Sequence, residues 1–168
     1  DYLKEGIAHT LDETRNLSDS GQFEDISLQQ GIRQILYPYE EMEVLNPEWE
    51  VILKDIIDSL FEQMSDEEYN ILNEEFGTYM VSRAYEYRQL LEYLVFRYFA
   101  KSIYDYDFLG KCQMLVTNFF VIRQMDIIRW LDNHREYSFK DRMDVVHIFS
   151  RQVEYSEDNI ENLYEDFI

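Results

Sequence analysis

The segments LLEYLVFRYFAKSIYD (residues 90–105) and DFLGKCQMLVTNFFVIRQMDIIRWL (residues 107–131) decide how the rest of this chain must fold. In the first, apolar side chains recur three and four residues apart, the spacing of one face of a helix. The second is apolar on nearly every face, and a helix of that kind is buried. Tyr104 to Asp107 is the expected turn, with Asp107 as the cap of the second helix. We therefore predict a central helical hairpin that the other helices surround.

Protein rather than lipid is the expected surrounding of this hairpin. Lys111 and Arg123 enclose only 11 residues, which Thr117 and Asn118 interrupt. A membrane span needs about 20 consecutive apolar residues. The hairpin is therefore predicted to be the core of a soluble helical domain.

The composition favours a single all-α domain. Of 168 residues, 46% are hydrophobic, and only 5 Gly and 2 Pro are present, which indicates few turns and long helices. No strand-like alternation extends beyond a few residues. We predict a helical bundle of about six to eight helices over residues 1–168, with residues 1–38 as the one stretch that could form an N-terminal appendage. Because residue 1 is Asp rather than Met, we expect the chain to be a piece of a longer protein or a processed protein.

Local signals predict where the first helices begin and end. Residues 2–17 have a helical repeat, and residues 17–22 (LSDSGQ) form a loop. Ser27 and Gln30 have the spacing of a capping box, and Pro38 is expected to end the helix that follows. An acidic connector, residues 38–46, comes next.

The later boundaries rest on the same kinds of signal. Asn46 followed by Pro47 predicts a helix start, and Ser65 with Glu68 predicts another capping box. Gly77 is expected to end that helix. Ser138 is expected to cap one last long helix, in which Ser156 interrupts the apolar face.

The net charge of −20 makes nucleic acid and anionic membranes improbable partners, because both repel an acidic surface. Two acidic blocks, residues 40–76 and 154–168, flank a nearly balanced centre. A solvated surface explains these blocks most simply, and attraction of a Lys-rich partner is the sharper hypothesis. The single cysteine, Cys112, excludes an internal disulfide and a cysteine-based metal site, and it fits a reducing cytoplasm. We expect Cys112 to be an inert, buried thiol.

No motif with a chemical signature is present: the chain has no Gly-rich phosphate loop, no H-E-x-x-H and no CxxC. His147 falls in a row with Asp144, Arg151, Glu154 and Asp158 at helical spacing, which usually indicates a solvent face with ion pairs. A binding site for a charged ligand is the alternative interpretation of that row.

Arg97 is the other unusual position, because it lies within the most apolar helix. A buried guanidinium needs a carboxylate partner, and Glu154 or Glu157 of the last helix would supply one if that helix packs alongside. An ion pair that stabilises the fold is the favoured interpretation, and a substrate contact is the alternative.

Two stretches resemble a known family. They are Leu90–Lys111, which continues into TNFFVIRQM, and IFSRQVEYSEDNIENL, residues 148–163. The matching residues are Glu92, Tyr93, Leu94, Val95, Arg97, Tyr98, Phe99, Ser150, Arg151, Glu154, Ser156, Glu157 and Asn159. In order and spacing they resemble the C-terminal region of the bacterial lysine-N-methylases, the flagellin lysine methylases of FliB type.

The resemblance implies a cytoplasmic protein-lysine N-methyltransferase that takes its methyl group from S-adenosylmethionine and contains an iron–sulfur cluster. The cysteines that hold the cluster belong to the family's N-terminal part, so no cofactor or metal is expected in this fragment, and the fragment alone is expected to be inactive. The expected partners are that cysteine-bearing domain and a Lys-rich substrate such as flagellin. The residues assigned to a substrate contact or to the domain interface are Glu92, Tyr93, Arg97, Arg151, Glu154, Ser156, Glu157 and Asn159.

Two other functions remain open at this stage. One is a non-enzymatic acidic adaptor or oligomerisation module, whose binding to a basic partner would depend steeply on salt. The other is a small-molecule sensor with a pocket between its helices. The sequence alone decides neither the true substrate nor the oligomeric state.

Overall fold

The computed structural model describes residues 26–166, and in this part of the chain every regular element is a helix. The α-helices are α2 (Leu28–Glu40), α3 (Pro47–Ile56), α4 (Asp66–Met80), α5 (Ala84–Arg97), α6 (Ser102–Asp105), α7 (Phe108–Asp132), α8 (Phe139–Phe149) and α9 (Glu157–Asp166). Short π-helical or 3-10 segments join them: η1 (Ile57–Glu62), η2 (Val81–Arg83), η3 (Phe99–Lys101) and η4 (Ser150–Glu154). The predicted all-α fold is confirmed. The helix and loop predicted within residues 2–22 lie outside the described residues.

The polar caps that the sequence indicated are present. Ser27, Ser65 and Ser138 each accept a hydrogen bond from a backbone N–H three residues on, and each forms a reciprocal capping box. Asn46 caps α3, with Pro47 in its first turn. These side chains satisfy N–H groups that have no partner inside the helix, which is why they mark its start.

Two predicted helix ends are wrong. α2 continues through Pro38 to Glu40, and α4 continues through Gly77 to Met80. Pro38 costs little so close to the end of α2, and Tyr39 holds that last turn because its buried hydroxyl donates to Asn118 Oδ1 at 2.6 Å. Gly77 keeps a helical backbone, since a glycine ends a helix only where the chain turns left-handed.

The predicted hairpin is confirmed. α5, η3 and α6 form its first arm, α7 forms its second, and Tyr106 turns the chain with a φ of 59°. Asp107 caps α7 by accepting from the Gly110 N–H at 2.9 Å. A Cβ at position 110 would overlap the Asp107 carboxylate, so the cap requires glycine there.

The last helix is not continuous, contrary to prediction. α8 passes into η4, the chain turns at Tyr155, and α9 begins after Ser156. Ser156 Oγ accepts from the Asn159 N–H at 3.1 Å, so the residue expected to interrupt one helix begins another. Hydroxyl side chains favour such caps over helix interiors.

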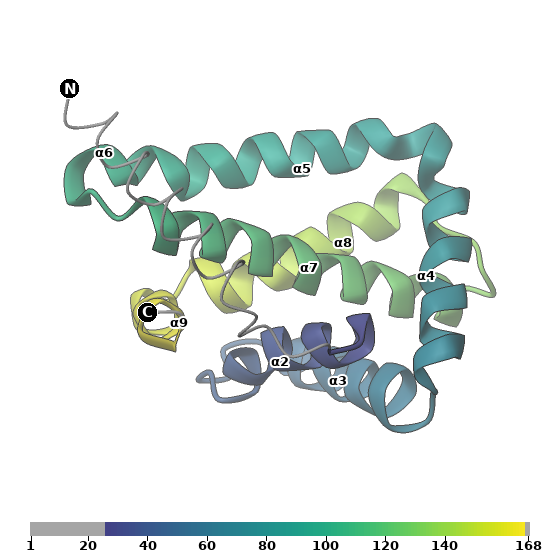
Figure 1. The fold of residues 1–168 in the computed structure, drawn as a ribbon. Helices are drawn as coiled ribbons and strands as arrows, with labels where there is room; N and C mark the ends of the chain where they lie inside the picture. The colour runs from purple at the N-terminus through teal and green to yellow at the C-terminus, as the bar shows by residue number, and fades with distance from the viewer. Residues whose placement is uncertain (1–25, 167–168) are drawn as a thin grey trace.

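α7 is the central element of the fold (Figure 1). It contacts α5 on one side, α2 and α3 on another, and α8 and α9 on the remaining face. α4 runs across the end of the bundle and connects the layer of α2 and α3 to α5 (Figure 1). Met114, Val121, Ile122, Met125 and Ile127 of α7 are at most 1% exposed, so they form the middle of the core. No helix in residues 26–166 has both the length and the apolar character that crossing a membrane requires.

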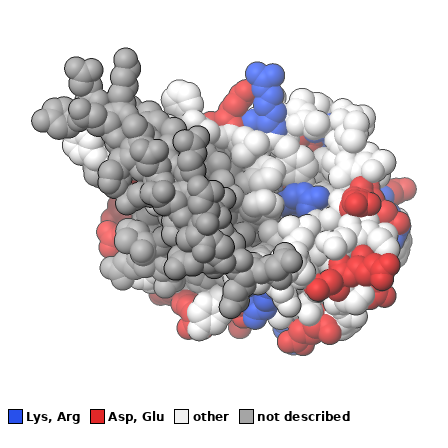
Figure 2. Space-filling model, viewed as in Figure 1, with Lys and Arg blue, Asp and Glu red and all other residues white. Residues whose placement is uncertain are grey.

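The charges are distributed unevenly over the described surface. In Figure 2, Asp and Glu side chains gather over the region where Figure 1 places α4 and the end of α3, whereas the region of α5 at the top shows mainly uncharged atoms around a projecting basic side chain with an acidic one beside it. A face with few charges on so acidic a chain is where another protein surface can approach with the least repulsion.

Candidate functional site

At the contact between α5 and η4, the carboxylate of Glu154 brings together two other predicted site residues, Tyr93 and Arg97, and two residues that were not predicted, Tyr98 and Ser150. Its oxygens accept hydrogen bonds from the hydroxyls of Tyr93 at 2.6 Å, Ser150 at 2.7 Å and Tyr98 at 3.1 Å. Arg97 Nε lies 3.9 Å from the same carboxylate, and Arg97 Nη2 donates to the Glu154 main-chain oxygen at 3.2 Å. We call Tyr93, Arg97, Tyr98, Ser150 and Glu154 the Glu154 cluster. The predicted partnership between Arg97 and Glu154 is confirmed.

Burial makes this cluster a strong connection between two elements far apart in the sequence. The Glu154 side chain is 4% exposed, so its charge depends on these donors rather than on water. Burial raises the pKa of the Tyr98 hydroxyl, and the Glu154 carboxylate raises it further. Burial and the same carboxylate also raise the pKa of Tyr93, so both tyrosine hydroxyls stay protonated at neutral pH and continue to donate. The π-helical turn of η4 presents Glu154 toward α5, and π-turns of this kind recur at functional sites.

The other predicted site residues lie elsewhere. Glu92 is exposed and pairs with Arg88 on the surface of α5, at 2.8 Å. Ser156 caps α9, and Glu157 is exposed in the first turn of that helix. The side chain of Asn159 is buried and bonds to the main chain of Glu43 in the acidic connector. Arg151 lies on another face of the molecule, described below.

Beside the Glu154 cluster, α5 presents an apolar surface that nothing covers in the described structure. Leu91, Val95 and Phe96 are 36%, 43% and 84% exposed, and together with the intervening side chains they line a shallow hollow. We call these three residues the α5 outer face. The prediction that other helices surround the hairpin therefore holds for most of α7, apart from the exposed Leu109, Cys112 and Val116, and is wrong for this face of α5. Phe119 packs against the core and contacts Tyr87, whereas Phe99 is partly buried and contacts Phe108.

A second buried polar group, which the sequence analysis missed, joins α5, α7 and α8. Asp126 of α7 is fully buried and accepts from the hydroxyls of Tyr87, at 2.8 Å, and Tyr137, and from the guanidinium of Arg142. Arg142 Nε also lies 3.5 Å from Glu86. Burial raises the pKa of Asp126, and the neighbouring Arg142 opposes that rise. The available signal was an Asp within the apolar run MDII, which is the same kind of signal that singled out Arg97.

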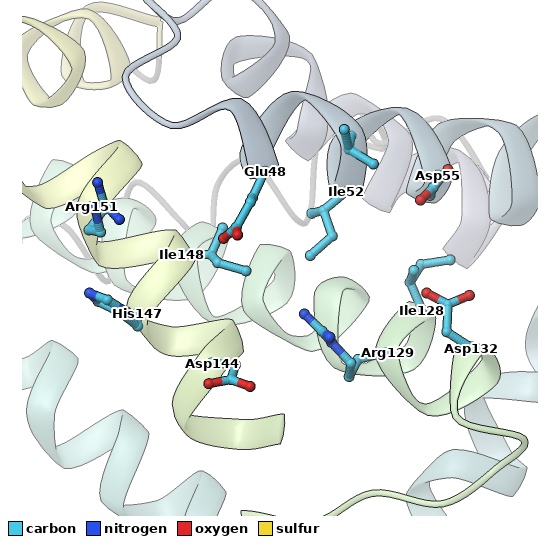
Figure 3. Close-up of a pocket in the computed structure, with 11 residues that line it drawn as sticks. Glu48, Ile52, Asp55, Ile128, Arg129, Asp132, Asp144, His147, Ile148 and Arg151 are labelled. Atoms are coloured by element: carbon cyan, nitrogen blue, oxygen red, sulfur yellow. The ribbon is translucent and has the colours of Figure 1, made fainter. Parts of the chain in front are cut away.

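The residues predicted to form one row with His147 do not all lie on the same face of the structure. Glu154 turns toward α5, and Asp158 belongs to the separate helix α9. Asp144, His147 and Arg151 remain together and line a groove between α3, α7 and α8 (Figure 3). This α3–α8 groove has a volume of about 590 Å³. Its lining residues are Glu48, Val51, Ile52, Asp55, Ile128, Arg129, Asp132, Asp144, His147, Ile148 and Arg151.

Cys112 is exposed, so the expected buried thiol is wrong. The part of the thiol surface that is covered raises its pKa, and the nearby Asp107 raises it further. A raised pKa keeps the thiol protonated at neutral pH, which makes it a poor nucleophile. Within residues 26–166, no group of three or more His, Cys, Asp or Glu side chains is arranged to hold a metal ion.

Comparison with protein families gives one match, to the family described as FliB lysine N-methylase C-terminal domain, over residues 1–168. Comparisons with curated proteins and with solved structures find no match.

Proposed function

Because the chain belongs to the FliB lysine N-methylase C-terminal domain family, we propose that it is the helical domain that supports the catalytic half of a bacterial protein-lysine N-methyltransferase. The observation that carries the proposal is the match over residues 1–168, which agrees with the resemblance in the two segments around Arg97 and Glu154. The proposed enzyme acts in the cytoplasm, transfers a methyl group from S-adenosylmethionine, and has a flagellin-type substrate.

The proposed catalytic half precedes this domain in the same protein and carries the cysteines of an iron–sulfur cluster. Four thiolates normally hold such a cluster, whereas this chain has only Cys112. The residues present here therefore do not fit the cluster, and we assign no step of the reaction to them. The role of the domain is to bind and orient the half that performs the chemistry.

The α5 outer face is the surface that we assign to this contact. Its three side chains are apolar and exposed, as at the centre of a protein interface, and the charged residues Arg88, Glu92 and Arg97 border them, as at an interface rim. The Glu154 cluster lies directly behind it and fixes α5 against η4 through Tyr93, Arg97 and Tyr98. A face held in one position presents the same side chains to every incoming partner, which lowers the entropic cost of docking.

The test compares the parent protein with the fragment of residues 1–168, using flagellin and S-adenosylmethionine labelled in its methyl group. We expect methyl transfer by the parent protein and none by the fragment. Turnover by the fragment alone, or no turnover by an intact parent protein that contains its cluster, would contradict the proposal.

A pair of variants tests the docking surface. Phe96→Ser in the parent protein should weaken the attachment of this domain and lower methyl transfer, because it removes the most exposed apolar side chain of the α5 outer face. Tyr37→Ser on α2 is the matched control, since Tyr37 is an exposed aromatic residue (60%) outside that face. Limited proteolysis between the two halves measures the attachment, and equal behaviour of the two variants would exclude this surface.

The second candidate function is an acidic adaptor without chemistry, which the charge of −20 and the uncovered α5 outer face favour. Binding of a basic partner would then weaken steeply with salt, and S-adenosylmethionine would have no effect on it. A methyl-transfer assay with the parent protein separates the two functions.

A further inference from the structure

The α3–α8 groove combines charged walls with an apolar floor. Figure 3 shows Asp55 of α3 and Asp132 of α7 at the same end of the groove, while Arg129 extends into its middle. Ile52 and Ile128 lie between these charges. An opening of about 590 Å³ with this lining has room for several residues of an extended peptide.

The arginines of this groove differ from those elsewhere in the described structure. Most lysines and arginines of residues 26–166 pair with a carboxylate or donate a side-chain hydrogen bond. Arg129 and Arg151 do neither within the described residues, although carboxylates line the same groove and the charge of Arg129 helps to lower the pKa of Asp141. Each guanidinium carries five donors in a planar fork that suits main-chain carbonyls or carboxylates. Two such groups with unused donors on the wall of one groove point to a ligand that brings acceptors.

At the other charged part of the groove, the end with Asp55 and Asp132, the lining is suited to a positively charged group of the ligand. Their side chains form no ion pair or hydrogen bond within the described part of the chain, and apolar side chains adjoin them. A lysine side chain matches this arrangement, because its methylene stem packs on isoleucine while its ammonium group meets carboxylates. The lining contains no Phe, Tyr or Trp, so it lacks the ring faces that best hold a quaternary ammonium group.

We propose that the α3–α8 groove binds an extended, lysine-bearing segment of the protein substrate before methyl transfer. Asp55 and Asp132 receive the ammonium group of a lysine, and Arg129 and Arg151 donate to main-chain carbonyls of the same segment. Methylation to the quaternary state removes the N–H donors of the lysine, so the groove holds the unmodified segment more tightly than the trimethylated one. This inference rests on the proposed function, since it assumes that lysine-bearing protein is the substrate.

The experiment measures binding of a fluorescein-labelled peptide of alternating Lys and Ser to the full-length parent protein by fluorescence anisotropy at low salt. The groove variant carries Asp55→Asn and Asp132→Asn. The control variant carries Glu62→Gln and Glu161→Gln, which remove the same charge from exposed positions outside the groove. We expect the Kd to rise about fivefold to tenfold in the groove variant, as the loss of two exposed ion pairs predicts, and less than twofold in the control.

A second measurement does not depend on any variant. A carbodiimide forms an amide between the bound peptide's lysine and a contacting carboxylate, and mass spectrometry then locates it. We expect Asp55 and Asp132 to be the main positions, and a trimethyl-lysine peptide to compete more weakly than the unmodified one. An equal rise in Kd for both variants, or crosslinks spread over the acidic surface, would overturn the inference.

Methyl transfer to flagellin is measured with the same proteins, so that the proposed function and the peptide site in the α3–α8 groove can be refuted independently. A groove variant with a raised KM and an unchanged kcat supports the groove. If the parent protein binds the peptide at Asp55 and Asp132 but shows no methyl transfer, the proposed function is refuted and the peptide site is supported. If methyl transfer occurs and the groove variant changes neither KM nor Kd, only the proposal of peptide binding in the groove is refuted.

Discussion

Both arms of the central hairpin are rich in apolar residues, yet other helices cover most of α7 and leave one face of α5 exposed. α7 contacts α2, α3, α5, α8 and α9, and it buries Met114, Val121 and Ile127 completely or nearly so, although a few residues of its first half are exposed. α5 has a similar density of apolar residues, but Leu91, Val95 and Phe96 remain exposed. An apolar side chain is therefore evidence that some surface must cover it, and that surface need not belong to the same domain.

The polar residues within the two arms sharpen this contrast. Asp126 lies deep in α7 and is satisfied by Arg142 and two tyrosine hydroxyls of its own domain. Arg97 lies at the end of α5, between the core and the α5 outer face, and reaches Glu154 of η4. The first group holds the interior together, whereas the second holds a surface in place.

The largest effect is expected at Asp126. Asp126→Asn should lower the free energy of unfolding by about 3 kcal/mol, because Arg142 loses its nearest carboxylate and keeps only Glu86. Phe96→Ser on α5 should change it by no more than about 0.5 kcal/mol, as is usual for exposed positions. Urea unfolding of the same protein measures both values, and similar losses in the two variants would show that α5 is covered as α7 is.

A smaller loss is expected at the Glu154 cluster. Glu154→Gln should cost about 2 kcal/mol, since the neutral amide replaces a charged acceptor of three hydroxyl groups. The pKa of Tyr93 should also fall toward its ordinary value of 10, because burial and the Glu154 carboxylate both raise it and the variant removes the carboxylate. NMR titration of labelled tyrosine reports this change. Glu157→Gln, at an exposed position, is the control and should leave both quantities unaltered.

The smallest changes in stability, with opposite signs, are expected for alanine substitutions at two helical glycines. Gly77→Ala should stabilise the protein by about 0.5 to 1 kcal/mol, because a methyl group at that position meets no atom within 4 Å and alanine favours the helix. Gly110→Ala should instead destabilise it by about 1 kcal/mol, since the new methyl group displaces the Asp107 cap of α7. Thermal unfolding compares the two, and a gain at both positions would mean that the cap is dispensable.

Local chemistry made several features predictable from the sequence. Ser27, Ser65 and Ser138 begin helices because a hydroxyl or amide oxygen at that position bonds to N–H groups only a few residues away. The partnership of Arg97 with Glu154 was predictable because a guanidinium on an apolar helix has few ways to be satisfied. In contrast, Tyr98 and Ser150 were not predicted as members of that cluster, although Ser150 stands one helical turn before Glu154.

Other features were not predictable because distant contacts outweigh local preference. Pro38 remains inside α2, where Tyr39 holds the last turn through Asn118, which is 79 residues further along the chain. The break near Ser156 places Asn159 against the main chain of Glu43, on a connector more than a hundred residues earlier. The α3–α8 groove likewise arises only where three separate helices meet.

By itself, the sequence determined the helical class, the central hairpin, most helix starts and the family resemblance, because these follow from periodicity and from bonds within one or two turns. The tertiary structure alone decided which apolar face stays exposed, which hydroxyl groups donate to the carboxylates of Asp126 and Glu154, and where a groove opens. Those outcomes depend on which helices pack side by side, and packing is set by the summed contacts of all helices rather than by any one segment.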